Sequence, residues 1–84
     1  MKFSERNKEL LKVVDKFAEI HDKYTNSNRI LTDEEWNTYI NEMDFLNKNF
    51  KSTNMATFAG GVSMAFLDDT TFIQKKLKEL KDAT

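Results

Sequence analysis

His21 is the only side chain in this sequence that could act as a general base near neutral pH, since it is the only histidine. Acid–base catalysis also needs an acid, an orienting residue or a metal beside that base. Asp22 follows directly, but neighbouring positions of a helix point about 100° apart and do not form a supporting pair. His21 also falls on an apolar helix stripe, where a structural histidine is the more frequent role. We therefore expect no catalytic residue.

Two pairs of adjacent carboxylates, Glu34-Glu35 and Asp68-Asp69, are the other candidates for chemistry. Both stand where a helix is expected to begin, and there acidic side chains cap free amides and complement the helix dipole. The chain has no cysteine, so with one histidine it cannot form a His or Cys ligand cluster. It also lacks the spacings of an EF-hand, a P-loop and a dinucleotide fingerprint. The sequence predicts no enzyme, no metal, no cofactor and no small-molecule substrate.

A third pattern, Gly61-Val62-Ser63, is typical of the turn in helix-turn-helix DNA-binding proteins. With this turn, residues 64–69 would enter the major groove. They read MAFLDD, which is apolar and acidic where phosphates and base edges require basic or amide side chains. Nucleic acid is therefore disfavoured as a partner, and helix-turn-helix DNA binding is kept as the less favoured alternative.

The most informative feature of the chain is a sixteen-residue stretch without charge, from Ser52 to Leu67, in a protein of which 32% of residues are charged. It reads STNMATFAGGVSMAFL and holds both glycines, Gly60 and Gly61. Uncharged residues favour burial, and glycine allows two backbones to approach closely. We expect this stretch to be covered by the rest of the chain, by a second copy, or by another protein.

Length and composition indicate one small helical domain over residues 1–84. A domain of this size hides only about 60% of its unfolded surface, so its stability is marginal without efficient packing or an oligomer. The chain has no proline, and its apolar residues follow a helical period, which predicts an all-α fold. No run reaches the ~20 apolar residues of a membrane span, and the N-terminus lacks the apolar region of a signal peptide. We expect no membrane span and a cytoplasmic protein.

Two helices are expected in the first part of the chain. The first runs from Ser4, a possible N-cap, to Tyr24, with a wide apolar stripe made of Phe3, Leu10, Val14, Phe17, His21 and Tyr24, flanked by Leu11, Val13, Ala18 and Ile20. The second begins at Thr32, where Glu35 completes a capping box. Its apolar face holds Trp36, Tyr39, Ile40, Met43, Leu46 and Phe50. Phe45 points almost the opposite way and should be exposed.

A third helix is expected over residues 55–67 and a fourth after it. The third has a core stripe of Met55, Phe58, Ala59, Val62, Ala65 and Phe66. Two interior glycines cost roughly 1 kcal/mol each, so we expect either a close helix crossing at Gly60-Gly61 or a break there. Residues 68–71 offer caps, with Thr71 and Gln74 spaced as a capping box for the last helix, whose stripe is Ile73, Leu77 and Leu80. We predict an antiparallel four-helix bundle, with a three-helix core plus a C-terminal helix as the alternative.

Protein–protein binding is the function that these patterns favour, with another protein or a second copy as the partner. The candidate contact residues are Phe45, Gly60, Gly61, Met64 and Leu67. Residues 32–47 hold five acids and no base, so the second helix could also enter a basic groove on a target. A regulator or inhibitor of a host protein complex, of the kind that phages and other mobile elements encode, fits this length. A homodimeric structural bundle is the competing hypothesis.

Overall fold

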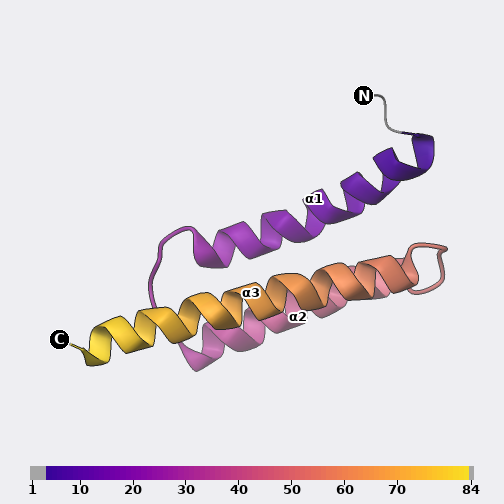
Figure 1. Cartoon of the computed structure of the whole chain (residues 1–84). Coiled ribbons are helices and arrows are strands. Elements are labelled where there is room, and N and C mark those ends of the chain that lie inside the picture. The colour runs from indigo at the N-terminus through magenta and orange to yellow at the C-terminus, as the bar shows by residue number, and fades with distance from the viewer. Residues whose placement is uncertain (1–3, 84) are drawn as a thin grey trace.

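The computed structural model describes residues 4–83, and within this range the chain forms three helices and no strand. They are α1 (Glu5–Thr25), α2 (Asp33–Phe50) and α3 (Ala56–Asp82). Figure 1 shows α1 antiparallel to α2 and α2 antiparallel to α3, with the C-terminal end of α3 extending past the other two helices. The bundle is flattened, with extents of 50 × 30 × 17 Å. The all-α prediction is confirmed.

The first two helices begin at the residues that the sequence predicts. The Ser4 hydroxyl accepts a hydrogen bond from the Asn7 amide at 3.1 Å. Thr32 and Glu35 form the reciprocal capping box: the Thr32 hydroxyl accepts from the Glu35 amide at 3.1 Å, and Glu35 Oε1 accepts from the Thr32 amide at 2.9 Å. Each cap satisfies amides that the first turn of a helix leaves without partners.

The four-helix prediction is wrong, because the expected third and fourth helices are one continuous helix. α3 runs for 27 residues through both Gly60-Gly61 and Asp68–Thr71 without a break. The hydroxyls of Thr70 and Thr71 donate to the carbonyls of Phe66 and Leu67, four residues earlier, at 3.0 and 2.9 Å. Threonines that bond back in this way remain inside a helix and do not cap a new one. The fold is thus a three-helix bundle.

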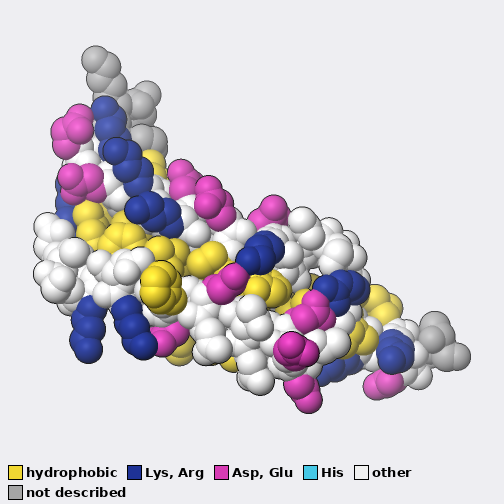
Figure 2. Space-filling view, turned by 180° about the vertical axis from the view of Figure 1, so that it is seen from behind, with side chains coloured by type: hydrophobic (Ala, Val, Ile, Leu, Met, Phe, Trp, Pro, Cys, Tyr) yellow, Lys and Arg dark blue, Asp and Glu magenta, His cyan; other side chains and the backbone are white. Residues whose placement is uncertain are grey.

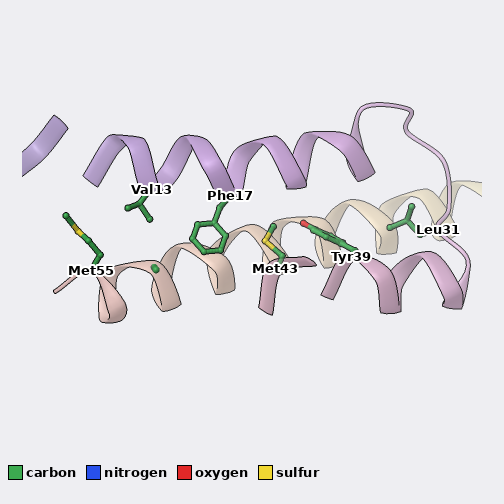
Figure 3. Packing of buried hydrophobic residues seen from close by; sticks show 7 residues of the cluster. Val13, Phe17, Leu31, Tyr39, Met43 and Met55 are labelled. Atoms are coloured by element: carbon green, nitrogen blue, oxygen red, sulfur yellow. The ribbon is translucent and has the colours of Figure 1, made fainter. Parts of the chain in front are cut away.

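The core lies where the three helices meet. Its buried apolar residues are Val13, Phe17, Leu31, Tyr39, Met43, Met55 and Ala59. Figure 3 shows Phe17 of α1 pointing toward the other two helices, with Tyr39 and Met43 of α2 farther along the core. Burying a large apolar side chain contributes about 1.5–3 kcal/mol, so this short list accounts for much of the stability of the domain. Ala65, predicted in the core, is exposed instead, and Phe3 lies outside the described residues.

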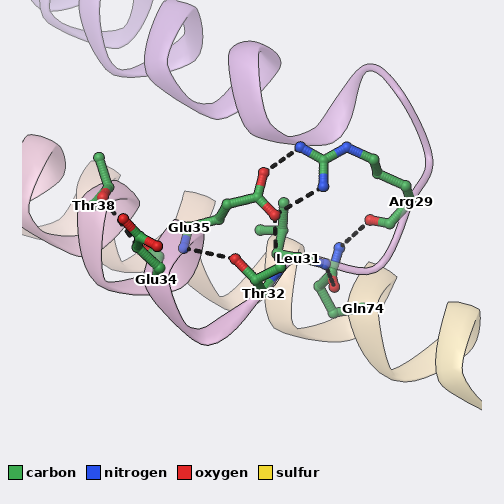
Figure 4. Close-up of polar contacts among 7 residues, drawn as sticks. All are labelled: Arg29, Leu31, Thr32, Glu34, Glu35, Thr38 and Gln74. Carbon is green, nitrogen blue, oxygen red and sulfur yellow. Dashed lines mark hydrogen bonds and ion pairs between the residues drawn. The ribbon is translucent and has the colours of Figure 1, made fainter.

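Three polar residues of α3, Ser63, Thr70 and Gln74, are as buried as the core. Gln74 is 3% exposed; its Oε1 accepts from the Leu31 amide at 2.8 Å, and its Nε2 donates to the Arg29 carbonyl at 3.0 Å. Figure 4 shows this amide joining α3 to the connection before α2. The predicted Thr71–Gln74 capping box is therefore wrong, because Gln74 satisfies a distant segment of backbone.

Candidate interaction surface

The structure divides the predicted contact residues between two sides of α2. Phe45 is 70% exposed, which confirms the prediction for this side chain. It lines a groove of about 570 Å³ between α1 and α2 together with Ile20, Lys23, Thr38, Asn41, Glu42, Leu46 and Asn49. Figure 2 shows the side of the molecule on which α2 lies in front of α3, where apolar side chains form a broken band with basic and acidic side chains around it.

Three of the predicted residues, Gly60, Met64 and Leu67, line a different groove on the other side of α2. This α2/α3 groove has a volume of about 320 Å³ and is completed by Ile40, Met43, Asp44, Asn47 and Ser63. Met64 stands at its edge and is 61% exposed. Phe45 therefore does not belong to the same surface as the other candidates.

The outer side of α3 adjoins this groove and carries no charge over its first three turns. At about 100° per residue, Thr57, Gly61, Met64 and Ala65 point to one side of the helix, and all four are exposed. We call these four residues the α3 face. Asp68 is the first charged residue that follows on this side. The uncharged stretch is thus only half covered by the chain itself.

The glycine pair does not mediate a close helix crossing inside the chain, so that prediction is wrong. A Cβ atom added at Gly60 or Gly61 would meet no atom within 4 Å apart from the local helix backbone. Neither glycine has a positive φ angle. Neither the backbone conformation nor the packing of this chain requires glycine at these positions, because the core side of α3 is formed by other residues.

Ile40 belongs to the same surface but the sequence places it in the core. It is 46% exposed and lines the α2/α3 groove. The sequence feature that could have indicated its exposure is its position at the edge of the apolar stripe of α2, about 100° from the fully buried Tyr39. A residue at the edge of an apolar stripe is buried only if the neighbouring helix covers it, and α3 does not cover Ile40.

The acids of α2 are largely paired within the chain. Glu35 binds both terminal nitrogens of Arg29, Glu42 accepts from Lys23 at 2.6 Å, and Asp44 lies 3.3 Å from Lys48. The Arg29 guanidinium, with the Thr32 amide, lowers the pKa of Glu35 to about 2. An acidic helix whose charges are already neutralised gains less from a basic groove on a target. This reduces the support for the hypothesis that α2 enters such a groove.

Glu42 is the most constrained of these carboxylates. Burial raises its pKa, but the bonds from Lys23 and Tyr24 outweigh this effect, and the net shift is downward. Its Oε2 is buried without a partner at hydrogen-bond distance. The pKa of Tyr24 is raised, first by burial and then by this carboxylate. Glu42, Lys23 and Tyr24 therefore form a structural contact between α1 and α2.

His21 makes a contact that the sequence does not predict. Its Nε2 lies 2.8 Å from Oδ2 of Asp69, which belongs to α3, and its ring packs against Phe66 with centroids 4.8 Å apart. The supporting acid is therefore Asp69 and not the adjacent Asp22. Neither His21 nor Asp69 lines either groove described above. The pair joins α1 to α3.

The remaining sequence hypotheses concern metals, membranes and DNA. Within residues 4–83, no three His, Asp or Glu side chains come close enough together to hold a metal ion. Over the same range, every helix is too short or too polar to pass through a bilayer. Gly61-Val62-Ser63 lies inside α3, so the turn of a helix-turn-helix motif does not form.

Comparison of the chain with protein-family models, with curated proteins and with solved structures gives no match.

Proposed function

We propose that this protein is not an enzyme and that it works by binding protein, through the α3 face and the adjoining α2/α3 groove. The observation that carries this proposal is an uncharged helix side that the chain leaves open. Two classes of function fit this surface and this length: a regulator or inhibitor that docks onto a protein complex, and a homodimer in which the surface pairs with itself.

The charge pattern of α3 supports the proposal. A surface helix normally has its charged residues on the solvent side and its apolar residues toward the core. In α3 the first half carries no charge on either side, although its core side is already occupied by Ala59 and Ser63, which are buried. The open side consequently resembles the low-charge centre of a protein–protein interface.

Exposed apolar side chains support it further. Met64 and Ile40 are 61% and 46% exposed, and they stand on opposite walls of one groove. Scattered apolar residues on a surface are ordinary, but adjoining ones around a groove are typical of docking sites. Leu67 is half-buried, lines the same groove and extends its apolar lining.

The placement of the ionisable groups favours binding over catalysis. A catalytic base must reach a substrate, so it stands beside a cleft. His21 is bonded to Asp69 and packed on Phe66, away from both grooves. This arrangement supports a structural role for the histidine.

Photo-crosslinking in the cells that naturally produce this chain tests the proposal. A photoreactive amino acid is placed at Met64 and, as a control, at Lys12, which is exposed on α1. We expect a discrete covalent adduct from position 64 and none from position 12. The captured chain is identified by mass spectrometry, purified, and tested for binding to the wild-type chain and to Met64→Lys. The absence of any specific adduct at position 64 would contradict the proposal.

A further inference from the structure

We infer that the protein bound by the α3 face is a second copy of this chain, packed so that α3 of one copy crosses α3 of the other in antiparallel orientation. In this arrangement Met64 of each copy fills the gap left by the missing side chain of Gly61 in the other. The inference rests on the proposed function and names its partner.

Gly61 supplies the gap. It is exposed, it lies inside a continuous helix, and a Cβ there would meet no other part of the chain. Glycine in a helix interior is destabilising relative to alanine, and within residues 4–83 no close packing against Gly61 compensates for it. A helix packed from outside does compensate, because the absence of Cβ lets two helix axes approach at the lower end of the usual 8–10 Å.

Met64 supplies the side chain that fits this gap. It is 61% exposed and lies one helical turn after Gly61 on the same side of α3. The two residues are about 4.5 Å apart along the helix axis. A two-fold axis that passes α3 between Val62 and Ser63 therefore places each Met64 opposite Gly61 of the second copy. The contact repeats itself on both sides of the axis, as an isologous dimer requires.

The α3 face carries both the gap at Gly61 and the side chain of Met64 that fits it, and its charge pattern permits self-pairing. The α3 face has no acid or base through Leu67, so neither a basic nor an acidic partner finds a complement there. Between Thr57 and Asp68 self-pairing brings no like charges together in this register, because Asp68 of one copy lies opposite Thr57 of the other. A chain of this size also gains stability from an oligomer more than a larger domain does.

The surroundings of Met64 enlarge the contact. The α2/α3 groove runs beside it; Ile40 on the α2 wall is 46% exposed, and Leu67 in the lining is half-buried. A helix laid along the α3 face would cover part of this groove and of Ile40. Phe45, on the opposite side of α2, would remain open, which makes it a matched control.

Light scattering on a sizing column at about 0.1 mM protein is the first test, since dimer stability depends on protomer concentration. We expect the wild-type mass to be twice the 9.9 kDa of one chain. Gly61→Lys and Met64→Lys should each give the mass of one chain, with helical circular dichroism unchanged because both positions are exposed. Phe45→Lys introduces the same charge at an equally exposed position and should leave the dimer intact.

Gly61→Ala is the second variant, in case lysine disturbs the fold. Alanine raises helix propensity and meets no atom of its own chain, so the monomer should be at least as stable as the wild type. In the proposed dimer the added methyl group takes space that Met64 occupies. We expect the dimer to weaken by about tenfold or more, in keeping with overpacking of a close contact.

The absence of native cysteine allows the orientation to be measured directly. Thr57→Cys and Asp68→Cys chains are mixed and oxidised. The antiparallel register brings position 57 of one chain beside position 68 of the other, and separates the two positions 57 by about 16 Å along the axis. We expect the mixed disulfide and no disulfide between two Thr57→Cys chains.

The inference would be overturned by a monomeric wild type at about 0.1 mM, by a dimer that survives Gly61→Lys and Met64→Lys, or by a dominant disulfide between two Thr57→Cys chains. A monomer whose photoreactive position 64 captures a different protein would refute the second copy and leave the protein-binding function standing. A dimer that Phe45→Lys disrupts would move the interface to the α1/α2 groove and refute the α3 contact.

Discussion

The hydroxyls of Tyr39 and Thr70 lie 2.7 Å apart between α2 and α3, and neither side chain has any exposed surface. Thr70 also donates to the Phe66 carbonyl, so the Tyr39 hydroxyl is the donor to Thr70. Burial raises the pKa of Tyr39, which keeps its proton on the oxygen. The position of α3 on α2 thus depends on a polar contact inside an apolar core.

The Tyr39–Thr70 bond should contribute measurably to the free energy of unfolding. We expect Tyr39→Phe to cost about 1 kcal/mol, and Thr70→Val to cost about 1–3 kcal/mol because it leaves the tyrosine hydroxyl buried without a partner. The double variant should cost less than the sum of the two. Urea unfolding of the wild type, the two single variants and the double variant at one protein concentration measures this double-mutant cycle. Strictly additive losses would contradict an energetic coupling between Tyr39 and Thr70.

Gln74 should stabilise the connection between α1 and α2. Gln74→Leu keeps the volume but leaves the Leu31 amide and the Arg29 carbonyl without their partners, so we expect a loss of roughly 2 kcal/mol. Hydrogen exchange at the Leu31 amide should speed up more than exchange in the middle of α1. Lys75→Leu, at the exposed neighbouring position, is the control and should change neither quantity appreciably.

Gly60→Ala should stabilise the chain, since no neighbouring atom opposes the added methyl group. The expected gain is about 0.5–1 kcal/mol, which corresponds to a rise in Tm of about 2–8 °C for a domain of this size. Thermal unfolding followed by circular dichroism measures it. A lower Tm would mean that Gly60 makes a close contact with another molecule under the conditions of the measurement.

Glu35 should make the folded chain sensitive to acid. Its pKa is about 2 in the folded protein, against an ordinary value of 4.5, mainly because of the Arg29 guanidinium. A carboxyl with a lowered folded pKa stabilises the fold above its unfolded pKa, and this contribution disappears as the pH falls from about 4.5 to about 2. Glu35→Gln preserves the capping box but removes the ion pair. We expect its unfolding free energy to vary less with pH in this window than that of the wild type.

His21 should act as a packing residue rather than as a base. Asp69 is 53% exposed, so removing it with Asp69→Ala should cost no more than about 1 kcal/mol. His21→Ala should cost more, because it also removes the ring packed against Phe66. His21→Phe, which keeps an aromatic ring at this site, should recover most of that loss in urea unfolding. Equal costs for His21→Ala and Asp69→Ala would indicate that only the polar contact matters.

The sequence by itself determined the features that depend on neighbours along the chain. Ser4 and the Thr32–Glu35 capping box begin their helices as predicted, because a cap bonds amides two or three residues away. The exposure of Phe45 also followed from helical periodicity alone. For the same reason, the all-α fold required no knowledge of the packing.

Only the tertiary structure decided whether a local sequence pattern formed the structure that it predicts. Asp68–Thr71 and Gln74 read as a helix start, but α3 passes through them because Thr70 and Gln74 find buried partners on α2 and on the connection before it. Gly60 and Gly61 suggest a close crossing, yet a Cβ added at either glycine would meet no atom of a neighbouring helix within 4 Å. Helical periodicity predicted Ile40 in the core and Met64 on the surface, whereas the packing of α3 on α2 places both residues in the lining of one groove. Caps and periods describe a single helix, whereas these outcomes depend on where a neighbouring helix lies.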